Sequence, residues 1–208
     1  MTKTFYIGLI IMSFCVVSGC HHRPRVYVPP EIDLKDFEPL GIMVFQCNKE
    51  GKLDKVVTQK FIEAITEDQK MIQIIEMGTQ KEVLKKAGTV KLGPEAMKAI
   101  GEKYGVKTII AGDLDISDIH PRVSILPGVS LIDISADVEA ELVARMYNAE
   151  NGATLWTGSG HDERTIGGIS FIKGGHFAFD ADDPEAAYGE MAYDLVWHAT
   201  DDFRGWWK

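Results

Sequence analysis

The stretch from Gly93 to Ile119 constrains the fold more than any other, because it predicts a short helix followed at once by a strand inside a sheet. Pro94 suits the first position of a helix, and Gly105 suits its end. Between them, one stripe at helical spacing comprises Met97, Ile100, Gly101 and Tyr104. The apolar, β-branched run 106–111 that follows is typical of a strand covered on both faces. We interpret this stretch as scaffold rather than active site.

A strand that is buried on one face is predicted next. Beyond Gly112 the residues alternate, with Leu114 and Ile116 on one side and Asp113 and Asp115 on the other. The run 131–147 alternates for longer. Its apolar face comprises Ile132, Ile134, Ala136, Val138, Ala140, Leu142, Ala144 and Met146, and its polar face Asp133, Ser135, Asp137, Glu139, Glu141 and Arg145. A turn signal at 148–152 then predicts a hairpin with a short strand at 154–157.

The first half of the chain adds shorter elements. Buried strands are predicted at 40–45 and 71–75, separated by a turn at 48–52 and a helix in which apolar residues recur every fourth position from Leu53 to Ile65. The spacing of Thr79 and Glu82 fits a capping box and predicts a short helix that ends at Gly88. The order of elements is that of an α/β protein.

A last helix completes the pattern. Asp183 suits its cap, Pro184 suits its first turn, and Gly205 is predicted to end it. Its expected buried stripe comprises Tyr188, Met191, Ala192, Leu195, Ala199 and Phe203. We therefore predict a single α/β domain over residues 37–208, in which helices pack on a mixed β-sheet.

The segment from Gly158 to Phe179 is rich in glycine and in large apolar residues. A phosphate-binding loop would need Ser or Thr after its lysine, and Lys173 is followed by Gly174 instead. We interpret the segment as a flexible hairpin that touches a partner, a second subunit or lipid; the alternative is an ordinary loop packed on its own domain. Trp206 and Trp207 fit either packed core or an interface anchor. The hypothetical partner-binding residues are Ile169, Phe171, Phe177, Phe179, Trp206 and Trp207.

The first residues predict export and a lipid anchor. Lys3 precedes an apolar run, 5–17, that is too short for the ~20 residues of a spanning helix. The tetrapeptide Val17-Ser18-Gly19-Cys20 resembles the bacterial lipobox. That resemblance implies a lipoprotein signal peptide over residues 1–19, lipidation of Cys20, and, because His21 rather than Asp follows, delivery to the outer membrane.

A tether is expected between the anchor and the domain. Residues 20–36 include Pro24, Pro29 and Pro30 and show neither helical nor strand periodicity. The pair His21-His22 is more simply a solvated tail than a metal site.

Composition excludes several classes of function. The formal net charge of −9 offers no basic stripe for nucleic acid. Cys47 is the one cysteine left in the folded part, and no nearby histidine would activate it. Asp113 and Asp115 lie along a line, whereas Ca²⁺ needs six to eight converging oxygens. We expect no metal, no cofactor and no catalytic residue.

Two passages resemble a family of envelope lipoproteins. Residues 100–113, IGEKYGVKTIIAGD, resemble the helix-to-strand passage of lipoproteins related to CsgG, LpoB and the N-terminal domain of TolB. Residues 151–158, NGATLWTG, resemble a turn and strand near the end of those proteins and of the DUF799 group of surface lipoproteins. The resemblance implies an anticodon-binding-like α/β fold and members that act mostly by binding.

We therefore expect a non-enzymatic, outer-membrane-anchored lipoprotein whose domain faces the periplasm. It would bind an envelope protein of unknown identity, as an accessory or activator factor or in envelope assembly. The alternative is an oligomeric export or secretion component related to CsgG, which would form a homo-oligomer.

Overall fold

The helix and strand expected between Gly93 and Ile119 form α4 (Pro94–Tyr104) and β6 (Thr108–Ile125). The computed structural model describes residues 26–69, 71–125, 132–167, 169–172 and 176–208. The predicted signal peptide, 1–19, and Cys20 lie outside the described residues. The chain forms two units, one of Pro29–Gly205 and a small one of Met1–Val28 with Trp206–Lys208.

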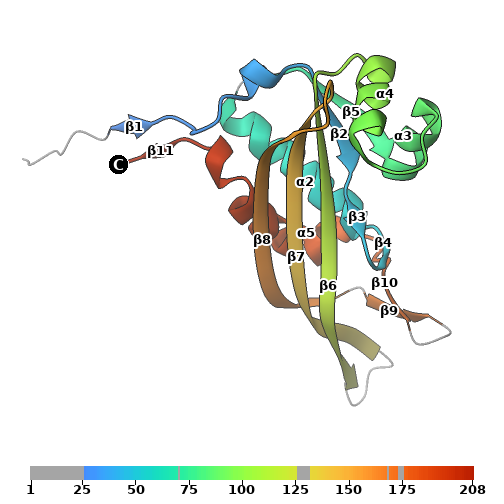
Figure 1. The fold of residues 1–208 in the computed structure, drawn as a ribbon. Coiled ribbons are helices and arrows are strands. Elements are labelled where there is room, and N and C mark those ends of the chain that lie inside the picture. The colour runs from blue at the N-terminus through green and yellow to red at the C-terminus, as the bar shows by residue number, and fades with distance from the viewer. Residues whose placement is uncertain (1–25, 70, 126–131, 168, 173–175) are drawn as a thin grey trace, which may run out of the picture. The chain divides into compact units, whose positions relative to one another are not determined.

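The larger unit is built on a mixed six-stranded sheet (Figure 1). Its main path runs β5–β2–β6–β7–β8, and β3 pairs with β6 beside β2. The added strands are β2 (Leu40–Val44), β3 (Gln46–Cys47), β5 (Ile74–Thr79), β7 (Ile132–Asn148) and β8 (Thr154–Gly167). β2 runs parallel to β5 and β6, whereas β6, β7 and β8 are antiparallel. The predicted α/β domain with a mixed sheet and packed helices is confirmed.

Two helical layers cover different parts of the sheet. α2 (Leu53–Gln69) and α5 (Pro184–Ala199) pack against one face and contribute to the larger core cluster. α3 (Gln80–Ala87) and α4 pack on the opposite face and form a second cluster. Ile109 belongs to the second cluster and Ile110 to the first, so the start of β6 is covered on both faces, as its composition predicts.

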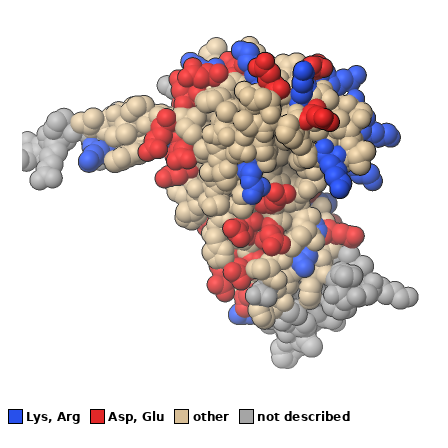
Figure 2. All heavy atoms as spheres, in the orientation of Figure 1, with Lys and Arg blue, Asp and Glu red and all other residues tan. Residues whose placement is uncertain are grey.

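The outward face of β6–β8 beyond α4 is polar. On β7 the predicted alternation is confirmed from Ala136 to Met146, where Ala136, Val138, Ala140, Leu142, Ala144 and Met146 are buried; the side chains of Ile132 and Ile134 are not described. The opposite face carries Asp113, Asp115, Asp137, Glu139, Glu141 and Glu163. Figure 2 shows acidic side chains gathered along these strands, while basic ones gather over α3 and α4.

The prediction that β8 stops at Thr157 is wrong, because the strand continues to Gly167. Gly158 and Gly160 lie where α5 crosses the strand. A Cβ at Gly158 would be 2.1 Å from the carbonyl oxygen of Ala199, and one at Gly160 would be 1.9 Å from that of Leu195. These two glycines therefore permit close helix–sheet packing, whereas the sequence interpretation assigned them to flexibility.

The rest of the glycine-rich segment is a hairpin. β9 (Ile169–Ile172) pairs with β10 (His176–Phe179) in antiparallel fashion. β10 also pairs, in parallel, with β4 (Glu50–Gly51), which occupies part of the predicted turn at 48–52. Gly51 has φ +134°, and a Cβ there would be 2.0 Å from the carbonyl oxygen of Phe179, so only glycine suits this contact.

Two predicted boundaries shift. β5 begins at Ile74 rather than at Met71, which is 96% exposed and has φ 51°. The last helix ends at Ala199 and not at Gly205, and the 3₁₀ turn η2 (Asp201–Phe203) follows it. At the end of the helix, the carbonyl oxygen of Val196 accepts both the Thr200 amide, over 2.9 Å, and the Thr200 hydroxyl, over 2.7 Å.

The predicted helix starts are confirmed. Thr79 and Glu82 form the capping box of α3, and Asp183 caps α5 with Pro184 in the first turn. Within the predicted tether the structure has the 3₁₀ turn η1 (Leu34–Phe37), where Leu34 is fully buried. In the small unit, β1 (Tyr27–Val28) pairs with β11 (Trp206–Trp207). No helix among the described residues is long and apolar enough to span a membrane.

Candidate functional site

The hairpin side chains proposed as partner contacts lie largely inside the domain. Phe179 is fully buried and Ile169 is 4% exposed, and both belong to the larger core cluster. The rings of Phe179 and Tyr188 meet edge-on with centroids 5.5 Å apart. Phe177 packs against the same cluster and pairs with Phe171, whose side chain lies outside the described residues. In this conformation, the domain itself covers Ile169 and Phe179.

Other predicted residues lie in the small unit. Trp206 and Trp207 form β11, and Trp206 is 53% exposed. Trp207 pairs with Tyr27, and its side chain is not described. Both tryptophans belong to the small unit, whereas Ile169 and Phe179 belong to the larger one.

Two exposed aromatic residues define a different candidate site on α5. Tyr193 and Trp197 are 52% and 45% exposed, and their rings stack with centroids 5.6 Å apart and planes at 22°. They are four residues apart, so they share one helix face. That face is turned away from the buried stripe, all six predicted members of which are buried.

Arg204 supports the Trp197 ring. Its guanidinium carbon lies 3.4 Å from the ring centroid, within the range of a cation–π contact. Its Nη2 donates to the carbonyl oxygen of Trp197 and, over 3.0 Å, to Asp201. The side chain is only 8% exposed, and its Nε and Nη1 have no hydrogen-bond partner among the described residues. The cation–π contact and the hydrogen bond to the Trp197 carbonyl oxygen thus fix the position of Trp197.

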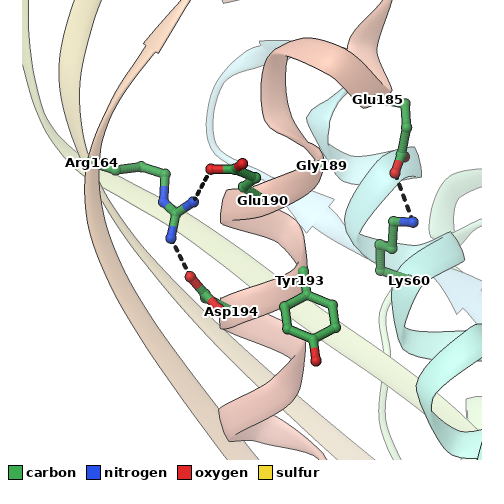
Figure 3. A pocket seen from close by; sticks show the side chains of 7 residues that line it. All are labelled: Lys60, Arg164, Glu185, Gly189, Glu190, Tyr193 and Asp194. Atoms are coloured by element: carbon green, nitrogen blue, oxygen red, sulfur yellow. Dashed lines mark hydrogen bonds and ion pairs between the residues drawn. The ribbon is translucent and has the colours of Figure 1, made fainter.

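Beside this stack, the surface of α5 carries two adjoining hollows that extend to α2 and, in the larger one, to Arg164 of β8; we call them the α2–α5 groove. The smaller, of about 210 Å³, is lined by Lys60, Glu63, Ala64, Glu67, Tyr193, Val196, Trp197 and Arg204. The larger, of about 480 Å³, is lined by Lys60, Arg164, Glu185, Gly189, Glu190, Tyr193 and Asp194 (Figure 3). Lys60 and Tyr193 line both hollows, so the two hollows adjoin at these side chains.

Ion pairs order the walls of the groove. Arg164, which reaches in from β8, donates to Glu190 over 3.2 Å and to Asp194, and its Nε donates to Asp162 over 2.6 Å. Partial burial alone would lower the pKa of Arg164, but the carboxylates of Asp162 and Asp194 outweigh it and raise the pKa. Figure 3 shows Arg164 between the two α5 carboxylates.

Lys60 spans the two helices. Its Nζ lies 2.7 Å from Glu185 of α5 and 3.2 Å from Glu63 of α2. The hydrogen bond to Glu185 is the main cause of the raised pKa of Lys60. Across both hollows, three cations face five carboxylates, so the groove is acidic overall despite its internal pairing.

Asp113 and Asp115 are engaged in other contacts, whereas His21 and His22, also considered for metal binding, lie outside the described residues. Asp113 pairs with Arg145 over 3.2 Å, and Asp115 accepts from the Asn48 side chain. In the described part of the chain, no group of three or more His, Cys, Asp or Glu side chains is arranged to hold a metal ion.

The candidate nucleophile and bases are dispersed. Burial raises the pKa of the Cys47 thiol, so the thiolate is disfavoured at neutral pH. His161, on β8, lies 3.9 Å from Glu139, and His198, on α5, has its Nδ1 2.8 Å from the carbonyl oxygen of Asp194. The structure does not bring these histidines and Cys47 into one cluster.

Sequence reasoning missed Tyr193 and Trp197. The signal was available, because the buried stripe of α5 was assigned correctly and these two large aromatic residues fall on the other face at helical spacing. That Lys60, Arg164 and Arg204 line the same groove could not be predicted from a local pattern. They come from α2, β8 and the segment after η2, which only the tertiary fold brings together.

Comparisons with known proteins give fold-level likenesses only. No family model matches the chain, and no curated protein matches it. It is similar to the PelC dodecamer from Paraburkholderia phytofirmans, at 8% identity and TM-score 0.44, over 86% of this chain and 96% of that one. It is also similar to the lipoprotein GNA1162 from Neisseria meningitidis, at 14% identity and TM-score 0.40, over 61% and 82%.

A further likeness is to the C-terminal domain of LpoB from Salmonella enterica, at 8% identity and TM-score 0.37, over 74% of this chain and 93% of that one. Solved structures similar to this chain therefore include a bacterial lipoprotein and the LpoB domain. At TM-scores this low, the likenesses assign neither a family nor a function.

Proposed function

We propose that the chain is a lipid-anchored protein of the bacterial outer membrane that binds a protein partner in the periplasm through the α2–α5 groove, without catalysing a reaction. The observation that carries the proposal is the exposed stack of Tyr193 and Trp197 beside that groove. The anchor is proposed at Cys20, on its lipobox-like sequence, and several acyl chains on one cysteine would hold a domain firmly to a bilayer.

Exposed, preorganised aromatic side chains favour a binding role. Tyr and Trp are enriched among the residues that dominate interface energies, and they lose little conformational entropy on binding because each has only two side-chain torsions. Here the Trp197 ring is already fixed by Tyr193 and by Arg204. A partner would therefore gain contact area without the cost of ordering these rings.

The charge of the groove indicates the chemistry of the partner. Its acidic excess would favour Lys or Arg side chains, and the 210 Å³ hollow beside Trp197 would suit one apolar or aromatic side chain. We propose a protein segment in which such a side chain is flanked by basic residues. Glu67, which lines the smaller hollow, is the carboxylate proposed to meet them, since Glu190 in the larger hollow already pairs with Arg164.

We also infer a relationship to the CsgG, LpoB and TolB N-terminal superfamily. Its support is the two passages that resemble it, which here form the end of α4 with the start of β6 and the turn that leads into β8. In that turn, Gly152 has φ +73°, and a Cβ there would be 2.5 Å from Cα of Pro94. The second passage thus requires glycine at this position, because the turn packs against the start of α4.

Site-specific photo-crosslinking in intact cells tests the binding proposal. A photoreactive residue at Tyr193 should give one crosslinked protein, identified by mass spectrometry, and Trp197→Ser should abolish that product. The matched control places the same probe at Val90, which is 88% exposed on a loop outside the groove. Equal crosslinking from both positions, or a product that survives Trp197→Ser, would contradict a specific site.

The identity of the product separates the two functional classes. A different envelope protein with a basic, apolar contact segment supports the proposal. A crosslink to a second copy of this chain would contradict it and favour the oligomeric export component.

A further inference from the structure

The small unit is a two-stranded ribbon that joins the residues after Cys20 to the last strand. The Val26 amide donates to the carbonyl oxygen of Lys208 over 3.1 Å, and the Lys208 amide returns a bond to Val26 over 2.9 Å. Tyr27 lies opposite Trp207, and Val28 opposite Trp206. A two-stranded ribbon is marginally stable in water by itself, so an apolar surface against which it could pack would stabilise it.

The described side chains of the ribbon are apolar and exposed. Val26 is 60% exposed, Trp206 is 53% exposed and Tyr27 is 42% exposed. Tyr and Trp combine an apolar ring with a polar tip, and both are enriched where membrane meets water. The ribbon thus has the composition of an interfacial anchor.

Charge distinguishes the ribbon from the larger unit. Residues 1–28 and 206–208 contain no Asp or Glu and four cations, Lys3, Arg23, Arg25 and Lys208, of which Lys3 would leave with the proposed signal peptide and three would stay with the acylated protein. Because the whole sequence has a formal charge of −9, residues 29–205 carry −13. An anionic phospholipid surface would therefore repel the larger unit and attract the ribbon.

We propose that the ribbon lies on the surface of the bilayer with the face that carries Val26, Val28, Trp206 and Lys208, placing Trp206 at headgroup level and Lys208 against anionic phospholipid. The inference rests on the proposed acylation of Cys20, which sets the reach. The six residues from Cys20 to Val26 span at most about 20 Å when fully extended. A ribbon attached so closely to an embedded acyl chain stays within the interfacial region or next to it.

This placement gives the ribbon a definite role. The acyl chain supplies the affinity for the membrane, and the ribbon supplies a second contact through the other end of the folded chain. Since β1 and β11 are hydrogen-bonded, both ends of the larger unit are held at the same surface.

The test measures quenching of tryptophan fluorescence by lipids brominated near the headgroup, with the full-length protein reconstituted in vesicles. The vesicles contain phosphatidylcholine alone or equal parts of phosphatidylcholine and phosphatidylglycerol. The unaltered protein should be quenched, more strongly with phosphatidylglycerol, and Trp206→Phe should remove part of the quenching. Trp197→Phe is the matched control, because that residue is similarly exposed but lies on α5. Trp197→Phe should leave the amount of tryptophan emission that the lipids quench unchanged.

A charge variant tests the lipid preference. Lys208→Ser should lower the ratio of bound to free ribbon on phosphatidylglycerol vesicles roughly fivefold, as expected for one basic residue at such a surface. Quenching that is unaffected by Trp206→Phe, or that falls equally in Trp197→Phe, would overturn the inference. So would equal quenching in both kinds of vesicle.

The test of the ribbon can be separated from the test of the proposed lipid anchor. Mass spectrometry of the N-terminal peptide shows whether Cys20 is acylated in the protein used. An unmodified Cys20 would refute the anchor. The comparison of Trp206→Phe with Trp197→Phe would still decide about the ribbon, because each variant differs from the unaltered protein in one tryptophan.

Discussion

The carbonyl oxygen of Leu195 on α5 lies so close to Gly160 on β8 that a Cβ added to the glycine would be 1.9 Å from it. Gly160→Ala must therefore push the helix away from the sheet or distort the strand. We expect a loss of about 1–3 kcal/mol in the free energy of unfolding, the usual range for overpacking. Urea denaturation followed by circular dichroism measures this loss.

Gly167→Ala is the control in the same strand. A Cβ at Gly167 meets no atom of the described residues within 4 Å. The substitution should change stability by no more than about 1 kcal/mol, and by restricting the unfolded chain it should favour the native state. If both variants had the same stability, close packing of α5 on β8 would not be the reason for Gly160.

Phe179 is expected to act as a core residue. It is fully buried and meets the ring of Tyr188, so Phe179→Ala should cost about 3–5 kcal/mol. Replacing residues 165–179 with a Gly-Ser linker should lower the thermal midpoint clearly, since each large buried side chain contributes roughly 1.5–3 kcal/mol. An almost unchanged midpoint together with a lost partner would instead restore the partner-loop interpretation of the hairpin.

The capping box of α3 should make stability depend on pH. The Thr79 amide donates to the Glu82 carboxylate over 3.0 Å, and this bond is the main reason why the pKa of Glu82 lies below its ordinary value of 4.5. A carboxyl group whose pKa is lowered by folding stabilises the folded state fully above its unfolded pKa. That contribution is lost as the pH falls below 4.5 and through the lower folded pKa.

The thermal midpoint of Glu82→Gln should therefore fall less steeply than that of the unaltered protein as the pH is lowered from neutral to below 4.5. Thr79→Ala, which removes the cap itself, should cost about 1 kcal/mol at neutral pH. If the thermal midpoint fell as steeply at acid pH in Glu82→Gln as in the unaltered protein, other carboxyl groups would be the cause of that fall.

Local patterns predicted the elements of the fold well. The α4-to-β6 passage, the alternation of β7 and the caps at Thr79 and Asp183 all follow from short-range preferences that the tertiary structure reinforces. Gly158 and Gly160 misled the prediction because the same residue type serves flexible loops and close packing. Only the position of α5 over β8 distinguishes the two uses.

The candidate site was less predictable. Phe179 was interpreted as a partner contact because it lies in a glycine-rich segment, but β4 and Tyr188 cover it through contacts distant in sequence. Tyr193 and Trp197 could have been found from helical periodicity alone. The support that Arg204 gives to Trp197 could not, since it depends on the helix ending at Ala199 and the chain turning back.

Labelling growing cells with a clickable fatty-acid analogue shows whether this domain is carried on a lipid anchor. We expect the immunoprecipitated protein to be tagged and Cys20→Ala to remain untagged, because Cys20 is the proposed acceptor of the acyl chains. Cys47→Ala is the matched control and should be labelled like the unaltered protein, since Cys47 is partly buried in the folded domain. Equal labelling of the unaltered protein and Cys20→Ala, or no labelling of either, would show that Cys20 does not carry a lipid anchor.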